Sequence, residues 1–311
     1  MPNFVFLLLM TLTGCVVGIQ GAVNTGLKKT IGVWESGLVS LTVTVFTSSF
    51  LVIFFRSGRF LLILSVPPWQ LFGGFCGVAF ISLSILCVSK IGAYKSSTAS
   101  ALGQLSCTML LDHFGLFNLS VKQLDFWRVI GFSFLVIGVL SVSKKLQHQG
   151  RPDDSIPKKE EATSSFLYVM LMIAAGGSLG LQGAINAGLS RTIGSMEGVL
   201  VSAIISTACL FLIVCITKSG NIRALSTAPR WQLTGGLCGF VILISNIVAV
   251  PVIGTYATSV AVSFGQLSCT ILIDHFGLFN LPVSRINRYR IFGFLLMISG
   301  VIFVFHAQLF K

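Results

Sequence analysis

The segment GQLSCTMLLDHFGLFNL at residues 103–119 occurs a second time, as GQLSCTILIDHFGLFNL at residues 265–281. The two copies differ at only two positions, and each difference exchanges one apolar residue for another. The same offset, without a gap, aligns GIQGAVNTGLKKTIG at residues 18–32 with GLQGAINAGLSRTIG at residues 180–194. The chain is therefore a tandem duplication of one unit.

The two units are joined by a polar stretch, KKLQHQGRPDDSIPKKEEATSS, at residues 144–165. Its charges and its prolines are typical of a flexible linker. The sequence therefore divides into a first repeat at residues 1–143, the linker, and a second repeat at residues 166–311.

The composition is that of an integral membrane protein. Of the 311 residues, 54% are hydrophobic and 10% are charged, and the mean hydropathy is +0.92. Soluble domains carry about 25% charged residues. The net charge of +12 comes from basic residues that lie between apolar runs, which favours membrane topology and anionic lipid over nucleic acid as the explanation. The eight cysteines lie in apolar runs without C-x-x-C spacing, so the sequence predicts neither a metal site nor a cofactor.

Each unit contains five apolar stretches, and a membrane helix needs about 20 such residues. They lie near residues 3–23, 36–55, 69–88, 96–111 and 126–143 in the first unit, and near residues 166–185, 198–217, 231–250, 255–273 and 291–309 in the second. Because five is odd, the second unit starts on the opposite side of the membrane from the first. The sequence thus predicts an all-α integral membrane fold with ten transmembrane helices in two inverted five-helix repeats, an arrangement found in many secondary transporters.

Lys and Arg are concentrated in the linker and in the loops that follow the first, third, seventh and ninth stretches. The positive-inside rule predicts that these segments lie in the cytoplasm. Both termini are then expected on the outer side of the membrane.

The first helix of each repeat carries two amides. Gln20 and Asn24 are four residues apart, and Gln182 and Asn186 occupy the matching positions. Residues with this spacing share one face of a helix. The amides either hold helices together by hydrogen bonds or line a central cavity where they bind a polar solute. We predict that they face one another across such a cavity.

A stripe of residues with a period of four runs along the fourth helix of each repeat. Its members are Ser100, Gln104, Thr108 and Asp112 in the first repeat, and Val262, Gln266, Thr270 and Asp274 in the second. Because lipid would leave a glutamine amide unpaired, Gln104 and Gln266 are expected to face the protein interior or a cavity. A hydrogen bond between helices is the alternative to a contact with solute.

Ionisable residues that occur in both repeats are candidates for gating and for coupling to protons. They are Glu35 and Glu197 at the start of the second helices, and Asp112, His113, Asp274 and His275 at the end of the fourth helices. A buried carboxyl group can titrate near neutral pH, as histidine does without help. The structural alternatives are helix caps for the two Glu residues and bonds from the two Asp residues to Arg128 and Arg290. No nucleophile motif accompanies the Asp-His pairs, so an enzyme is not predicted.

The G-x-Q-G-A-x-N motif of the first helix and the L-x-D-H-F-G-L-F segment that ends the fourth resemble the YdcZ-like branch of the drug/metabolite transporter superfamily, which is EamA-like. The resemblance covers both repeats. It implies a ten-helix drug/metabolite transporter fold and an exporter in a bacterial inner membrane. The chain departs from the related small multidrug exporters, which carry a Glu in the middle of the first helix where this chain has Gln20 and Gln182.

The sequence therefore predicts a secondary transporter that exports a small polar or amphipathic metabolite by alternating access. An ion channel with inverted repeats is the alternative, although the sequence contains no evident ring of charge for ion selectivity. The expected partners are a small-molecule solute and the lipid bilayer, with protons as candidate coupling ions. The protein is expected to act as a monomer or a homodimer.

Overall fold

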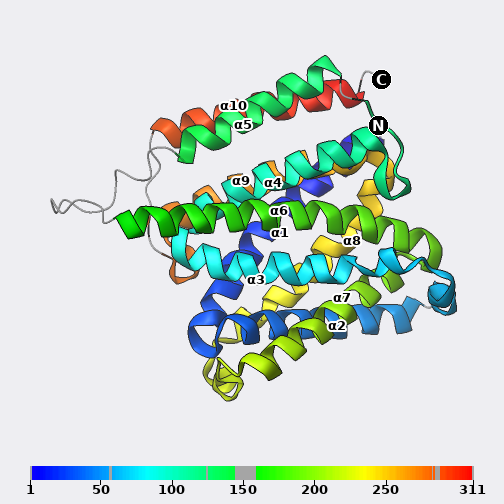
Figure 1. Ribbon diagram of the computed structural model, residues 1–311, viewed down its shortest axis with the longest axis vertical. Coiled ribbons are helices and arrows are strands. Elements are labelled where there is room, and N and C mark those ends of the chain that lie inside the picture. Colours follow the sequence, from blue (N-terminus) through cyan, green and yellow to red (C-terminus); the bar gives the residue numbers. More distant parts are fainter. Residues whose placement is uncertain are drawn as a thin grey trace.

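The computed structural model describes residues 2–55, 58–123, 125–143, 159–281, 283 and 288–309. Most of the predicted linker, residues 144–158, lies outside the described residues. The described parts of the chain form ten α-helices and no strand (Figure 1). The prediction of an all-α fold is therefore confirmed.

Every helix of the first repeat has a counterpart in the second. The first repeat contains α1 (Pro2–Ile31), α2 (Val33–Phe55), α3 (Gly73–Ile91), α4 (Ala93–Phe114) and α5 (Phe126–Ser143). The second repeat contains α6 (Lys159–Ile193), α7 (Ser195–Thr217), α8 (Gly235–Ile253), α9 (Thr255–Phe276) and α10 (Arg288–Leu309). Short 3-10 segments precede α3 and α8, namely η1 (Phe60–Ser65), η2 (Pro68–Leu71), η5 (Ile222–Thr227) and η6 (Arg230–Thr234).

Glycines with positive φ separate consecutive helices at matching positions. Gly32 and Gly194 have φ of 111° and separate α1 from α2 and α6 from α7. Gly92 and Gly254 have φ of 83° and 85° and separate α3 from α4 and α8 from α9. Residues with a side chain rarely adopt these angles, so glycine allows the chain to reverse without strain.

The two repeats are packed into each other rather than side by side. Helix α1 packs along α8 and α9 of the second repeat, and α6 packs along α3 and α4 of the first (Figure 1). The pairs α2/α7, α4/α9 and α5/α10, each made of two matching helices, are also in contact. An approximate two-fold axis between the repeats produces this pattern, in which each contact between two helices has a counterpart in the other repeat.

Glycines bring the crossing helices into backbone contact. A Cβ at Gly265 of α9 would lie 1.8 Å from the carbonyl oxygen of Thr11 in α1. A Cβ at Gly103 of α4 would lie 1.8 Å from the carbonyl oxygen of Ile173 in α6. Any side chain at either glycine would separate the helices. These two glycines are the first residues of the duplicated segment quoted above.

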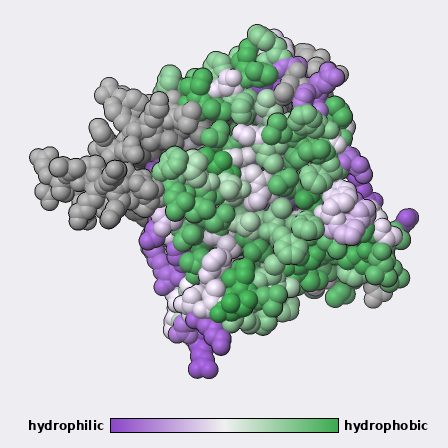
Figure 2. Space-filling model, in the orientation of Figure 1, coloured by the Kyte–Doolittle hydropathy of each residue, from purple (hydrophilic) through white to green (hydrophobic). Residues whose placement is uncertain are grey.

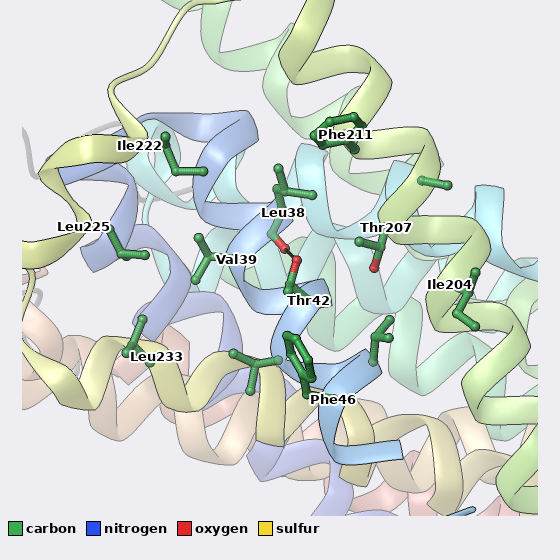
Figure 3. A pocket seen from close by; sticks show the side chains of 13 residues that line it. Leu38, Val39, Thr42, Phe46, Ile204, Thr207, Phe211, Ile222, Leu225 and Leu233 are labelled. Carbon is green, nitrogen blue, oxygen red and sulfur yellow. Dashed lines mark hydrogen bonds between the residues drawn. The ribbon is translucent and has the colours of Figure 1, made fainter. Parts of the chain in front are cut away.

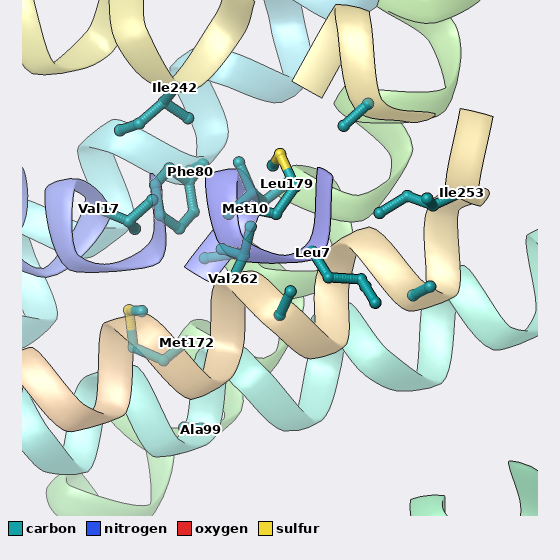
Figure 4. Packing of buried hydrophobic residues seen from close by; sticks show 14 of the residues in the cluster. Leu7, Met10, Val17, Phe80, Ala99, Met172, Leu179, Ile242, Ile253 and Val262 are labelled. Carbon is teal, nitrogen blue, oxygen red and sulfur yellow. The ribbon is translucent and has the colours of Figure 1, made fainter. Parts of the chain in front are cut away.

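The largest buried apolar cluster is built from both repeats (Figure 4). Leu7 and Phe80 of the first repeat pack in it with Met172 and Ile242 of the second. Since neither repeat encloses this cluster alone, the two repeats form a single structural unit.

Among the described residues, seven helices are long and apolar enough to cross a membrane. They are α1, α2, α6, α7 and α9, together with α3 and α8 extended by their preceding 3-10 turns. Helix α4 carries the polar stripe and packs against both α6 and α9. The apolar surface has hydrophilic residues along its left and right edges in Figure 2, as expected for a protein in a bilayer. The total of ten crossings stays a prediction.

Candidate functional site

The duplicated segments end in reciprocal caps on each other's helices. Asp112, at the end of α4, accepts hydrogen bonds of 3.1 Å from the backbone N–H groups of Thr255 and Tyr256, where α9 begins. Asp274, at the end of α9, accepts a 3.1 Å hydrogen bond from the N–H of Tyr94, where α4 begins. The matching helices α4 and α9 are therefore antiparallel. Each buried carboxylate satisfies N–H groups that a helix N-terminus leaves unpaired.

A cation accompanies the first of these caps. Lys122 Nζ donates a 2.8 Å hydrogen bond to the carbonyl oxygen of Ile253, at the end of α8. A Cβ at Gly254 would lie 2.6 Å from Lys122 Nζ and 3.0 Å from Asp112 Oδ2, so the two charged groups meet beside this glycine. Burial lowers the pKa of Lys122, the Asp112 charge opposes this effect, and the Arg128 charge adds to it. The sequence does not single out Lys122, because the matching residue in the second repeat, Ser284, is not a cation.

The arginine expected to bond to Asp112 has a different environment. Arg128 Nη1 donates a 3.4 Å hydrogen bond to the carbonyl oxygen of Lys122, and its guanidinium lies 6.0 Å from the ring centroid of Tyr256. The side chain of Arg290 lies outside the described residues.

Glu35 binds a loop of the other repeat. The backbone N–H of Gly220, just after α7, donates a 2.9 Å hydrogen bond to Glu35 Oε1. The next N–H, of Asn221, donates to the carbonyl oxygen of Ile31 at 3.0 Å. Glu35 is only 1% exposed, and its Oε2 has no hydrogen-bond partner among the described residues.

Glu197 has the matching environment at the other end of the molecule. A Cβ at Gly58 would lie 1.8 Å from the carboxyl carbon of Glu197, so the carboxylate lies directly on the backbone after α2. The N–H of Arg59 donates a 2.9 Å hydrogen bond to the carbonyl oxygen of Ile193. Glu35 and Glu197 thus contact the chain that follows a helix of the opposite repeat.

The two histidines lie next to the caps. His113 packs against Phe114, and its Nδ1 is buried and has no hydrogen-bond partner in the described structure. His275 packs against Phe276 with nearly the same geometry. Both histidines lie in the last turn of their helices, α4 and α9.

Gln20 and Gln182 line the same cavity, between α1, α2, α3, α6 and α8. Its volume is about 40 Å³, and Thr44 and Phe80 are among the other residues that line it. Gln20 Nε2 donates a 3.1 Å hydrogen bond to the carbonyl oxygen of Gly235. None of the described lining residues is charged.

Two glycines missed by sequence analysis make room for these amides. A Cβ at Gly77 would lie 2.6 Å from Gln182 Nε2, and a Cβ at Gly239 would lie 3.0 Å from Gln20 Nε2. The signal was present in the sequence, because the two glycines are separated by the offset of the duplication.

Asn24 and Asn186 lie outside the residues that line this cavity and face the starts of α8 and α3. A Cβ at Gly235 would lie 2.1 Å from Asn24 Oδ1, and a Cβ at Gly73 would lie 2.0 Å from Asn186 Oδ1. Asn186 Nδ2 donates a 3.1 Å hydrogen bond to Ser202 Oγ. The structure therefore brings two of the four predicted amides together at the cavity and places the other two at neighbouring helix contacts.

Gln104 and Gln266 are buried in the protein, as their position in the polar stripe predicts. Gln266 Nε2 donates a 3.2 Å hydrogen bond to Ser97 Oγ of α4. The Oε1 atoms of both glutamines are buried and have no hydrogen-bond partner in the described structure. Gln266 also lines a separate void of about 10 Å³, which is too small to hold a solute.

Comparison with known proteins identifies the family. The model of DMT_YdcZ, described as "Putative inner membrane exporter, YdcZ", matches residues 5–141 and again residues 167–303. The chain belongs to the DMT_YdcZ family. A solved structure titled "Crystal structure of protein" has a similar fold, with a TM-score of 0.63 and 11% sequence identity, over 99% of this chain and 97% of that chain. No curated protein matches the chain.

Membership of the YdcZ family makes this protein a multi-pass inner-membrane transporter with two repeats. The resemblance seen in the two duplicated motifs is thereby confirmed. The family description as an exporter favours a transporter over the ion channel that the sequence left open.

Proposed function

We propose that this YdcZ protein exports a small polar or amphipathic solute through the cavity between Gln20 and Gln182. The observation that supports this most is that one amide from each repeat reaches the same cavity. The amides can donate and accept hydrogen bonds, and the Thr44 hydroxyl, which donates to the Gly236 carbonyl oxygen at 2.7 Å, can accept one. Phe80 and Ile242 offer apolar contact. Because these amides are uncharged, they repel neither a cation nor an anion, and they bind the polar part of the solute by hydrogen bonds.

The cavity volume of about 40 Å³ holds little more than a water molecule or two. In this proposal a solute enters only when the repeats move apart at one end. With ten crossings and inverted repeats, the same movement at the other end releases it. Reporter fusions within the linker and at the C-terminus test the orientation, and a linker outside the cytoplasm would contradict it.

We place the gates at the ends of the bundle, where Asp112, Asp274, Glu35 and Glu197 bind backbone of the opposite repeat. Protonation of a carboxylate weakens its acceptance of backbone N–H groups. Protons would then couple to transport by releasing an end of the bundle, with His113 and His275 beside two of the gates. Exchange of Glu35 and Glu197 for Gln, singly and together, tests this in proteoliposomes across pH. Unchanged pH dependence in the double variant would exclude both Glu residues as coupling groups.

The solute class is tested by thermal-shift measurements on purified protein. The panel contains neutral polyols, zwitterionic amino acids, amphipathic organic cations and organic anions. We expect one class to stabilise the wild type and to lose this effect in the Gln20→Leu/Gln182→Leu variant. Gln70→Leu is the matched control, because Gln70 is a buried amide outside the residues that line the cavity. Equal stabilisation of all three proteins would contradict the proposed site. In a separate counterflow measurement, a solute flux that does not saturate with solute concentration would favour a channel.

A further inference from the structure

An apolar groove of about 650 Å³ opens between α2, α7 and the η5–η6 segment (Figure 3). Val43 and Phe46 of α2, Ile204 and Phe211 of α7, and Leu225 of η5 lie along it. We call this the α2/α7 groove. Its volume is in the range of pockets that bind drug-sized ligands, about 300–1,000 Å³.

The two hydroxyl groups that line the groove are bonded within their own helices. Thr42 Oγ1 donates a 2.8 Å hydrogen bond to the carbonyl oxygen of Leu38, and Thr207 Oγ1 donates one of 2.8 Å to that of Ala203. These residues therefore present methyl groups to an occupant. An apolar lining of this kind favours a hydrocarbon chain over a polar ligand.

The length of the groove corresponds to one leaflet of a bilayer. Leu38 and Phe46 both line it and are eight residues apart, which is about 12 Å along a helix. The hydrocarbon core is about 30 Å thick, so one leaflet contributes about 15 Å. Phe46 is 72% exposed and Phe211 is 55% exposed, which places the groove on the lipid-facing surface of the helices.

The end of the groove at the α7–α8 connection is basic. The sequence KSGNIRALSTAPR, residues 218–230, contains three cations and no acid. Arg223 is exposed and lies between two residues that line the groove, Ile222 and Leu225. Arg230 is also exposed and begins η6, which supplies Leu233 to the lining.

These two arginines are specific to this repeat. At the matching positions of the first repeat the chain has Leu61 and Pro68. Glu35, which accepts a hydrogen bond from the N–H of Gly220 in this connection, is buried, so it is not exposed at the rim.

We propose that the α2/α7 groove binds an anionic phospholipid, with one acyl chain between the helices and the phosphate at Arg223 and Arg230. Arginine pairs with phosphate through charge-assisted hydrogen bonds. Helix α2 presents Val43 and Val45 to the groove and Thr44 to the Gln20/Gln182 cavity, so the lipid contacts the outer side of a cavity wall. This site is independent of the identity of the exported solute.

Native mass spectrometry of the full-length protein in detergent tests the site, with dioleoyl phosphatidylglycerol and dioleoyl phosphatidylcholine as probes. The wild type is expected to bind phosphatidylglycerol more tightly. Arg223→Leu and Arg230→Ala should each weaken that binding by about fivefold, since a cation near a lipid phosphate contributes about that much. Arg59→Leu is the control, because Arg59 is an exposed cation of the matching loop. Equal binding of both lipids, or equal loss in all three variants, would overturn the proposal.

A second pair of variants tests the acyl chain. Ala208→Phe places a ring in the groove and should weaken binding of both lipids by at least about fivefold. Thr207→Val is its control, because the hydroxyl that it removes is bonded within α7. Unchanged lipid binding by Ala208→Phe would overturn the proposal, as would equally tight binding of glycerol 3-phosphate, which has the phosphate and no chain.

Discussion

The carboxylate of Asp112 lies 3.1 Å from the backbone nitrogen of Thr255, so the end of α4 meets the start of α9. Asp274 makes the corresponding contact with Tyr94, at the other end of the same two helices. Because α4 and α9 are the same helix of the duplicated unit, one sequence segment closes both ends of the bundle. The proposed gating requires that one end opens while the cap at the other end is kept.

Removing the charge of either cap should destabilise the protein. In Asp112→Asn one oxygen becomes an NH₂ group, which cannot accept from the N–H groups of Thr255 or Tyr256. A loss of about 1–2 kcal/mol is expected for a helix cap that leaves a buried donor unpaired. Asp274→Asn should lose less, because asparagine keeps one oxygen that can accept from the N–H of Tyr94. Thermal unfolding in detergent measures both losses.

Asp125→Asn is the control for these variants. Asp125 Oδ1 accepts from the N–H of Arg128 at the start of α5, and asparagine serves equally well at such a position. Equal melting temperatures for Asp112→Asn and Asp125→Asn would contradict the role of the reciprocal caps.

Lys122 should make the stability depend on alkaline pH. Its pKa is lowered from 10.5 in the folded state, chiefly by burial. Between the folded and unfolded pKa values the unfolded chain binds more protons, so the free energy of unfolding rises with pH in that window. The melting temperature of the wild type should therefore increase relative to that of Lys122→Met as pH approaches 10.5. Parallel curves for the two proteins would show that burial of Lys122 is not coupled to folding.

Alanine at the glycines where helices cross should destabilise the protein strongly. A Cβ at Gly265 meets the carbonyl oxygen of Thr11 at 1.8 Å, so Gly265→Ala forces α1 and α9 apart, at a cost of about 1–3 kcal/mol or more. Gly177→Ala is the control, because its nearest contact is at 3.8 Å. A melting temperature of Gly265→Ala equal to that of the control would contradict the close contact between α1 and α9.

Alanine at Gly239 should affect solute binding. Its Cβ would lie 2.8 Å from Thr44 Oγ1 and 3.0 Å from Gln20 Nε2, which displaces two of the polar groups that line the cavity. The apparent affinity for the solute class found in the thermal-shift panel should then fall at least about tenfold. Gly21→Ala, whose nearest contact is Val88 Cγ2 at 4.0 Å, should retain the wild-type affinity. Equal affinities in the two variants would exclude this wall from the site.

The fold could be predicted from sequence because each apolar stretch and each motif occurs twice, so that one copy clarifies the other. The helix stretch near residues 96–111 is short and polar alone, but its copy near residues 255–273 is uncharged and bounded by Gly254. The burial of Gln104 and Gln266 followed from the cost of an unpaired amide in lipid.

The partners of the site residues could not be predicted in the same way. Gln20 and Asn24 share a helix face and both contact Gly235, yet Gln20 lines the cavity and Asn24 does not. The sequence suggests a cap of its own helix or a coupling group for Glu35, but it does not reveal the hydrogen bond to Gly220 of the other repeat. Such contacts between repeats depend on tertiary packing, which the periodicity of a helix does not contain.

Accessibility of the cavity from both sides of the membrane tests the proposed transport most directly. Gln20→Cys and Gln182→Cys are made in a protein whose eight native cysteines are replaced, and they are labelled with a membrane-impermeant thiol reagent. The reagent is applied to intact spheroplasts and, separately, to inside-out vesicles. Alternating access predicts that each cysteine is labelled from both sides. Labelling of either cysteine from one side only, or no labelling of either, would contradict it.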